Sequence, residues 1–214
     1  MVFLMAQKWK IAIVAFIASA ICLAGCSDPD PENIPLGTRD YASTQSARCP
    51  TSTLQGGTGR TDHAELAGGL KFSIRTPANY DSTYQHPLIV VYSAARQNRF
   101  RTEAVTGFTT SATAAGFIVA YVDSVRLNLR TIKLLSQIPV AIAKKWCVDQ
   151  TRVYLTGHSD GGTVSNAIAF MPDVPIRPRA IAPSAAGIRI SDMQDVNCPP
   201  EVSVMTWQNN ADKL

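Results

Sequence analysis

The chain has 214 residues, of which 46% are hydrophobic, and its formal net charge is +4. This length and composition are typical of one folded domain and exclude a chain that is disordered throughout. This net charge is too small to indicate nucleic-acid binding, and the Lys and Arg residues of the chain form no basic stripe.

The first 25 residues have the three parts of a secretory signal peptide. Lys8 and Lys10 provide positive charge, residues 11–23 form an apolar run, and small residues follow. The run is shorter than the roughly 20 residues of a membrane-spanning helix. Leu23-Ala24-Gly25-Cys26 resembles the lipobox of bacterial lipoproteins, which implies that Cys26 carries a lipid and anchors the chain to a membrane. A plain signal peptide and an uncleaved anchor are the alternatives.

The lipobox resemblance implies an extracytoplasmic, lipid-anchored protein, in the periplasm, at the outer membrane or on the cell surface. Residues 26–60 are rich in Asp, Pro, Ser, Thr and Gly and predict a flexible tether. We expect the folded domain to span residues 61–214.

The domain alternates predicted strands and helices. In chain order, hydrophobic patterning indicates a half-exposed strand at 70–75, a buried strand at 88–92, a helix at 104–115, a strand at 117–122, an amphipathic helix at 132–146, a strand at 152–156, a helix at 161–170, and strands at 179–183 and 202–207. This order predicts an α/β fold, with a mainly parallel sheet and helices on both of its faces.

Three cysteines remain once Cys22 is assigned to the leader and Cys26 to the lipid. They are Cys49, Cys147 and Cys198. An exported chain meets an oxidising compartment, so we expect disulfide pairing. Three cysteines allow one bridge in three ways, and the sequence does not choose among them.

The sequence contains no pattern typical of a cofactor or metal site. It lacks a dinucleotide fingerprint, a P-loop and the His/Cys spacing of a zinc site. Arg96, Arg99 and Arg101 form a small basic cluster, which we interpret as a solvated loop. The alternative is a site that receives an acidic group of a substrate.

Gly157-His158-Ser159-Asp160-Gly161 follows a predicted strand and opens a predicted helix. This is the G-x-S-x-G pattern of a nucleophile elbow, in which Gly157 and Gly161 permit a tight turn and Ser159 attacks a carbonyl carbon. We expect the backbone N–H of Asp160 and the N-terminus of the helix to stabilise the oxyanion that forms. The alternative is a structural glycine-rich turn.

Four segments, at 77–81, 87–91, 147–162 and 180–187, resemble one family. They are similar to the polyhydroxybutyrate depolymerase and feruloyl/acetyl-xylan esterase group of α/β-hydrolases. The resemblance implies an α/β-hydrolase fold, no cofactor, and acyl transfer on an ester substrate, either a polyester or a feruloyl or acetyl ester. It puts the catalytic acid at Asp212; a surface carboxylate is the alternative.

The sequence departs from the family pattern in three places. Ser93-Ala94 replaces His-Gly in the loop that supplies one oxyanion N–H, which the backbone of Ala94 can still donate. The stretch from Asp123 to Ile132 is shorter than in the family. The catalytic histidine expected after the acid is absent, and the resemblance implies that the last strand and helix of the fold are missing.

None of the three histidines, His63, His86 and His158, is predicted to act as the base. His158 lies inside the elbow, where we expect it to pack rather than to act on Ser159. The sequence therefore predicts a secreted, lipid-anchored serine ester hydrolase that is impaired because it lacks a base. The alternative is a non-catalytic cell-surface binding lipoprotein derived from an esterase.

Overall fold

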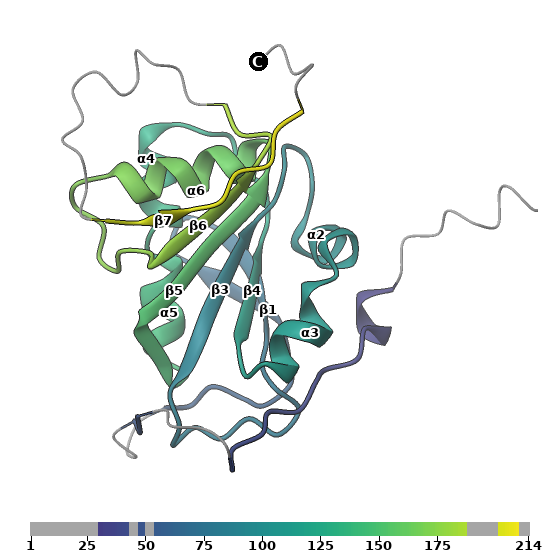
Figure 1. The fold of residues 1–214 in the computed structure, drawn as a ribbon. Coiled ribbons are helices and arrows are strands. Elements are labelled where there is room, and N and C mark those ends of the chain that lie inside the picture. Colours follow the sequence, from purple (N-terminus) through teal and green to yellow (C-terminus); the bar gives the residue numbers. More distant parts are fainter. Residues whose placement is uncertain (1–29, 43–46, 50–53, 188–200, 210–214) are drawn as a thin grey trace, which may run out of the picture. The chain divides into compact units, whose positions relative to one another are not determined.

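The computed structural model describes residues 30–42, 47–49, 54–187 and 201–209 of the chain (Figure 1). Three residues with predicted roles lie outside these ranges: Cys26, Cys198 and Asp212. The chain from Pro31 onward belongs to one structural unit. Among the described residues, no helix is long and apolar enough to cross a membrane.

A seven-stranded sheet runs in the order β1-β2-β4-β3-β5-β6-β7. The pairs β1–β2 and β2–β4 are antiparallel, and the other neighbouring pairs are parallel. The α/β class and the mainly parallel sheet predicted from the sequence are therefore confirmed. The strands are β1 (Arg60–Leu66), β2 (Leu70–Arg75), β3 (His86–Tyr92), β4 (Ile118–Val122), β5 (Val148–His158), β6 (Ala180–Ser184) and β7 (Ser203–Val204).

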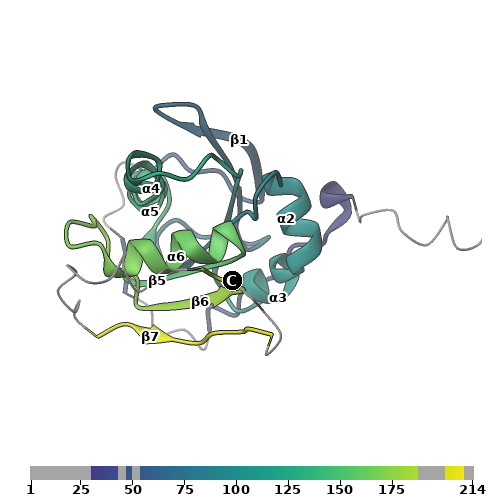
Figure 2. The same cartoon turned by 90° about the horizontal axis from the view of Figure 1, so that it is seen from above.

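Helices lie on both faces of the sheet (Figure 2). Helices α4, α5 and α6 cover one face, while α2 and α3 cover part of the other. Right-handed crossovers require this division, because the chain moves one way along the sheet from β3 to β4 and the opposite way from β4 to β5 and β6. The helical segments are η1 (Pro31–Asn33), α2 (Arg99–Thr106), α3 (Phe108–Ala114), α4 (Leu129–Leu135), α5 (Ile138–Ala143) and α6 (Asp160–Phe170).

Most side chains of the central strands β3 and β4 are buried, on both faces of the sheet, as their unbroken apolar runs predict. Leu88 and Val90 of β3 belong to the main core, on the side of α4, α5 and α6. Val91 belongs to a smaller cluster on the opposite face, together with Val119 and Tyr121 of β4. Alternate residues of a strand point to opposite faces, so β3 and β4 supply both layers.

Two predicted helices are each divided in two. The expected helix 104–115 is interrupted at Gly107, whose φ of 62° ends α2 in the left-handed region before α3 begins. The expected helix 132–146 is interrupted between Leu135 and Ile138, and Pro139 lies in the first turn of α5. Proline is tolerated there because the first turn of a helix needs no N–H donor.

The described part of the segment 31–60 differs from the flexible tether expected from its composition. The N–H of Arg39 donates to Asn79 Oδ1 (2.8 Å), and its guanidinium contacts the ring of buried His86 (3.1 Å). Further along, the Trp146 indole donates to the carbonyl of Gly57 (3.0 Å). Polar contacts with the domain replace the apolar burial that the segment cannot provide for itself.

A disulfide also holds this segment, because Cys49 is bonded to Cys147. Of the three pairings that the sequence left open, the structure contains this one. Cys147 is fully buried between α5 and the start of β5, so the bond fixes residues 47–49 against the sheet.

Candidate active site

Ser159 lies at the junction of β5 and α6 in a strained backbone conformation, with φ 54° and ψ −118°. Positive φ is unfavourable for residues other than glycine and persists only where the surroundings enforce it. The N–H of Ser159 donates to the carbonyl of Ser184 at the end of β6 (2.9 Å). Its own carbonyl accepts from the N–H of Thr163 in α6 (2.9 Å). The neighbouring strand and the helix therefore hold the turn from both sides.

Close contacts with neighbouring backbone leave no room for a side chain at the glycines that flank Ser159. A Cβ atom at Gly161 would lie 2.0 Å from the carbonyl oxygen of Tyr92, and one at Gly157 would lie 2.6 Å from the same oxygen. A Cβ atom at Gly162 would lie 2.9 Å from the carbonyl oxygen of Ser184. Side chains at these positions would push the first turn of α6 away from the ends of β3 and β6.

The two predicted oxyanion donors lie at the same edge of the sheet. Tyr92 of β3 is in register with Gly157 of β5, so the residues that follow these parallel strands are neighbours. Asp160 opens α6, where the first N–H groups have no partner within the helix. Ala94 follows β3 in a loop that Ser93 fixes, because the Ser93 hydroxyl donates to the carbonyl of Val122 (2.5 Å).

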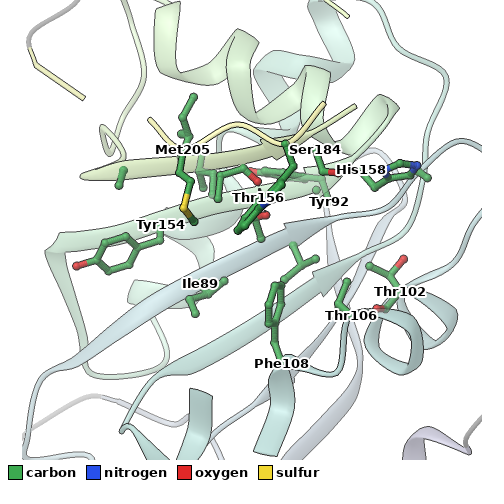
Figure 3. Close-up of a pocket in the computed structure, with 18 of the residues that line it drawn as sticks. Ile89, Tyr92, Thr102, Thr106, Phe108, Tyr154, Thr156, His158, Ser184 and Met205 are labelled. Atoms are coloured by element: carbon green, nitrogen blue, oxygen red, sulfur yellow. Dashed lines mark hydrogen bonds between the residues drawn. The ribbon is translucent and has the colours of Figure 1, made fainter. Parts of the chain in front are cut away.

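His158 does not pack inside the turn, and the expectation that it would is wrong. Its side chain is exposed, and its Nδ1 lies 3.3 Å from Ser184 Oγ (Figure 3). This pair was not predicted from the sequence. Its signal was the parallel order of the strands, because the ends of two adjacent parallel strands meet at one edge, and both residues end a strand.

The other two histidines lie elsewhere in the sheet. His63 is exposed on β1, the edge strand farthest from β6 and β7. His86 is the first residue of β3 and therefore lies at the opposite end of that strand from the elbow. Burial and the adjacent Arg39 guanidinium lower the pKa of His86, and its Nδ1 contacts the carbonyl of Gly116 (2.8 Å). Neither is placed to act on Ser159.

The chain that leads towards Asp212 approaches the elbow. The carbonyl of Trp207, after β7, accepts from the N–H of Ala185 (2.8 Å), and the Gln208 side chain donates to the carbonyl of Ala186 (3.3 Å). Ala185 and Ala186 directly follow the strand that ends at Ser184. The described chain therefore reaches the edge of the sheet that carries Ser159.

The basic cluster is only partly a solvated loop. Arg99 is buried and donates from Nη1 to the Asp123 carboxylate (2.7 Å) and from Nε to the carbonyl of Asp62 (2.9 Å). The same carboxylate accepts from the N–H of Arg99 (2.7 Å). The interpretation as a solvated loop is therefore wrong for Arg99, which anchors the start of α2.

A cavity of about 760 Å³ opens beside the elbow (Figure 3). It lies against the sheet face that α6 does not cover, and its walls are mostly apolar. Gly157, His158, Ser184 and Ala94 reach it from the elbow side. Among the described residues, no group of three His, Cys, Asp or Glu side chains is placed to hold a metal ion.

Comparison with known proteins yields similarity to solved structures only. No family model and no curated protein sequence matches the chain. Butyrate-bound esterase 2 of Thermogutta terrifontis is 16% identical, with a TM-score of 0.47 over 65% of this chain and 56% of that one. The same esterase phosphorylated by paraoxon is 15% identical, with a TM-score of 0.48 over 67% of this chain and 63% of that one.

A putative dipeptidyl aminopeptidase IV from Bacteroides ovatus is 20% identical, with a TM-score of 0.45 over 62% of this chain and 21% of that one. The chain thus spans less than two thirds of the length of each of these proteins. Similarities this weak add nothing to the chain's own topology, which is an α/β fold with a serine at the sharp turn between a parallel strand and a helix.

Proposed function

We propose that the chain is a serine ester hydrolase that acts by acyl transfer through Ser159. The observation that carries the proposal is the backbone of Ser159, with φ 54° and ψ −118° directly before α6. A turn of this kind presents the serine hydroxyl at the top of the sheet and aims the first N–H groups of the helix at the oxygen of the carbonyl group that the serine attacks.

The reaction has two halves. Ser159 Oγ forms a bond to the ester carbonyl carbon and passes its proton to a general base, while the N–H groups of Asp160 and Ala94 stabilise the oxyanion. The bond to the alcohol oxygen then breaks, and the leaving alcohol takes up a proton. Water attacks the acyl-serine in the same way, releases the acid and restores the serine.

Activity of this chain is expected to be low, because the serine needs a proton acceptor. His158 is the histidine at this edge of the sheet, but its ring contacts Ser184. Within the described residues, no hydrogen bond joins the Ser159 side chain to a histidine. This observation favours the second candidate, a binding lipoprotein that has lost catalysis.

A fluorescent phosphonate that reacts with activated serines tests the proposal. We expect the chain and its Ser184→Ala variant to be labelled and the Ser159→Ala variant to remain unlabelled. Loss of label in Ser184→Ala alone would instead identify Ser184 as the nucleophile. No label in a chain that unfolds cooperatively would support the binding lipoprotein.

The proposal includes export and a lipid anchor at Cys26, supported by the sequence of the first 26 residues. The bond between Cys49 and Cys147 supports export independently, because disulfides persist in oxidising compartments. Metabolic labelling with palmitate should mark the chain and its Cys22→Ser variant but not Cys26→Ser. Equal labelling of both variants would contradict the anchor.

The substrate class follows from the sequence resemblance, which implies a polyester or a feruloyl or acetyl ester. The loops that select a substrate lie outside the catalytic turn, so the turn itself does not choose among these esters.

A further inference from the structure

Several arginine side chains near the elbow have no partner in the protein. Among the described residues, four arginine side chains make no hydrogen bond or ion pair, and all four are exposed: Arg96, Arg126, Arg130 and Arg179. The first three follow the carboxyl ends of β3 and β4. These strands are parallel to β5, so the three arginines lie at the edge of the sheet that carries the elbow. Arg179 precedes β6 and therefore lies at the opposite end.

Hydrogen bonds join the segments that carry the three arginines at the elbow edge. The N–H of Ser124 donates to the carbonyl of Gln97 (3.0 Å), which ties the loop after β4 to the loop after β3. The Thr131 hydroxyl, in the first turn of α4, donates to the carbonyl of Arg126 (2.9 Å). Lys133 of α4 is a further exposed cation. Together these residues form a basic row, defined as Arg96, Arg126, Arg130 and Lys133.

Helix α4 holds its part of the basic row on the side away from the core. Ile132 and Leu135 are buried, whereas Arg130 and Lys133, three positions apart, are exposed neighbours on the helix surface. Helix α4 lies beside α6, which begins directly after Ser159 (Figure 1). Both helices begin at the elbow edge, because each follows the carboxyl end of a parallel strand. The basic row therefore runs beside the predicted nucleophile.

Acidic residues do not neutralise the basic row. Residues 124–148 contain five Lys and Arg residues and no Asp or Glu. The acids on either side have other partners, since Asp123 accepts from Arg99 Nη1 (2.7 Å) and Asp149 accepts from Arg152 Nε (2.6 Å). Asp160, at the start of α6, leaves an excess of cations at this edge. Uncompensated charge of one sign beside a site concentrates ligands of the opposite sign there.

The position of the basic row indicates what kind of anion it would bind. None of its residues lines the cavity, so it suits a polymer that lies across the surface rather than a small molecule in a pocket. Single-stranded nucleic acid stacks its bases on aromatic side chains, and the row contains none. A membrane surface requires an apolar face, whereas Leu129 is the single large apolar side chain of α4 that is exposed.

We propose that the basic row binds the carboxylates of an acidic polysaccharide, and that the ester cleaved at Ser159 is a substituent of that polymer. The inference rests on the proposed function and deepens it, because it names the alcohol part of the ester. The sequence left open a site for an acidic group of a substrate in the cluster that contains Arg96 and Arg99. Asp123 neutralises Arg99, whereas Arg96 remains available.

Binding is measured on the Ser159→Ala chain, so that the result is independent of catalysis. The probe is fluorescein-labelled oligogalacturonate, a carboxylate polymer, and binding is followed by fluorescence anisotropy. The matched ligand is the same polymer with its carboxylates methyl-esterified. We expect saturable binding of the charged polymer that weakens as salt is added, and no binding of the neutral polymer, because salt screens exposed charges. Equal binding of the two polymers would overturn the proposal.

Charge reversal within the basic row should weaken binding. Arg130→Glu replaces an attraction by a repulsion, and we expect affinity for oligogalacturonate to fall about five- to ten-fold. Glutamate is favourable in the first turn of a helix, so the variant should fold. The matched control is Arg179→Glu, which changes the net charge equally at an exposed, unpaired arginine at the other end of the sheet. Equal affinity in the two variants would overturn the proposal.

Other polyanions identify a different partner. Tighter binding of DNA or of phosphatidylglycerol vesicles than of oligogalacturonate, lost in Arg130→Glu, would assign the row to that partner and overturn the inference. Binding of oligogalacturonate without phosphonate labelling of the parent chain would uphold the row and refute the proposed catalysis. Labelling without oligogalacturonate binding would do the reverse.

Discussion

Ser159 owes its conformation to neighbours that lie far from it in the sequence. Its turn is held by the carbonyl of Ser184, 25 residues later, and by close contact between Gly161 and Tyr92. The local sequence supplies residues that tolerate the turn, and the adjacent strands impose it. Strain at one residue is therefore stored by the packing of three strands and a helix.

Replacing Gly161 by alanine tests this packing. The new Cβ atom would lie 2.0 Å from the Tyr92 carbonyl oxygen, so α6 must shift. We expect a loss of about 2 to 4 kcal/mol in the free energy of unfolding, measured in urea, and slower phosphonate labelling. The control is Gly57→Ala, where the added atom has no neighbour within 4 Å. Equal stability of the two variants would contradict the assigned role of Gly161.

His86 should make the stability of the chain depend on pH. Burial and Arg39 lower its pKa in the folded state below 6.5. Its contribution is therefore present in full above the unfolded value and is lost as the pH falls from there through the folded pKa. We expect the free energy of unfolding to decrease between pH 7 and pH 5.

Two variants separate this effect from other titrating groups. His86→Gln should flatten the decrease, while His63→Gln, at an exposed residue of β1, should leave it unchanged. Asp81 and Asp149 do not account for the decrease, because hydrogen bonds to Asp81, and at Asp149 hydrogen bonds that outweigh the opposing effect of burial, lower the pKa values of their carboxyl groups below the ordinary 3.8. An identical pH dependence in both variants would exclude His86 as its source.

At the scale of elements, α2 is joined to the sheet by a buried ion pair. Arg75 of β2 donates from Nε and Nη2 to the two carboxylate oxygens of Glu103 in α2 (2.8 and 2.6 Å). The pair has further partners, since Thr109 of α3 donates to Glu103 (2.7 Å) and Asp62 of β1 lies 2.7 Å from Arg75 Nη1. Both charges are almost completely buried. Four elements, β1, β2, α2 and α3, are thus fixed around one ion pair.

Removing one residue of the Arg75–Glu103 ion pair should lower the free energy of unfolding more than removing both. Glu103→Leu leaves the Arg75 charge buried and without its main partner, and we expect a loss of about 3 to 5 kcal/mol in unfolding free energy. The double variant Arg75→Met, Glu103→Leu should recover part of this loss. Exposed Glu65 on β1 provides the control Glu65→Leu. A double variant no more stable than Glu103→Leu would contradict the role of the uncompensated charge.

At the scale of the whole molecule, one covalent bond closes a long loop. Cys49 and Cys147 are separated by 98 residues, and the bond joins the early segment to the start of β5. A cross-link of this span lowers the entropy of the unfolded chain. The domain therefore depends on residues that precede the predicted boundary at 61.

The Cys49→Ser variant should lose about 2 to 5 kcal/mol of unfolding free energy under oxidising conditions. Reduction of the parent chain should bring its unfolding free energy close to that of Cys49→Ser, which checks that the bond is the cause. The matched control is Cys198→Ser, which we expect to match the parent chain. If Cys198→Ser is the destabilised variant instead, the assigned pairing is wrong.

The sequence by itself determined the fold class and the position of the elbow. The runs 88–92 and 117–122 are apolar because most of their side chains are buried in the two core layers, one on each face of the sheet. Gly157 and Gly161 flank Ser159 because a strand must turn sharply into a helix. These signals are local, since burial and turn geometry act on neighbouring residues. Gly107 and Pro139 are also local features, and each marks the interruption of a predicted helix. The sequence did not predict these interruptions, because helix-forming residues lie on both sides of them.

Only the tertiary structure decided which distant residues meet. The disulfide partner of Cys49, the contact between His158 and Ser184, and the docking of Arg39 beside His86 join residues 26 to 98 positions apart. Such contacts depend on strand order, register and the path of the chain, which no local pattern encodes. The open cavity beside the elbow has the same origin, because it is defined by where α2, α3 and β7 leave the sheet uncovered.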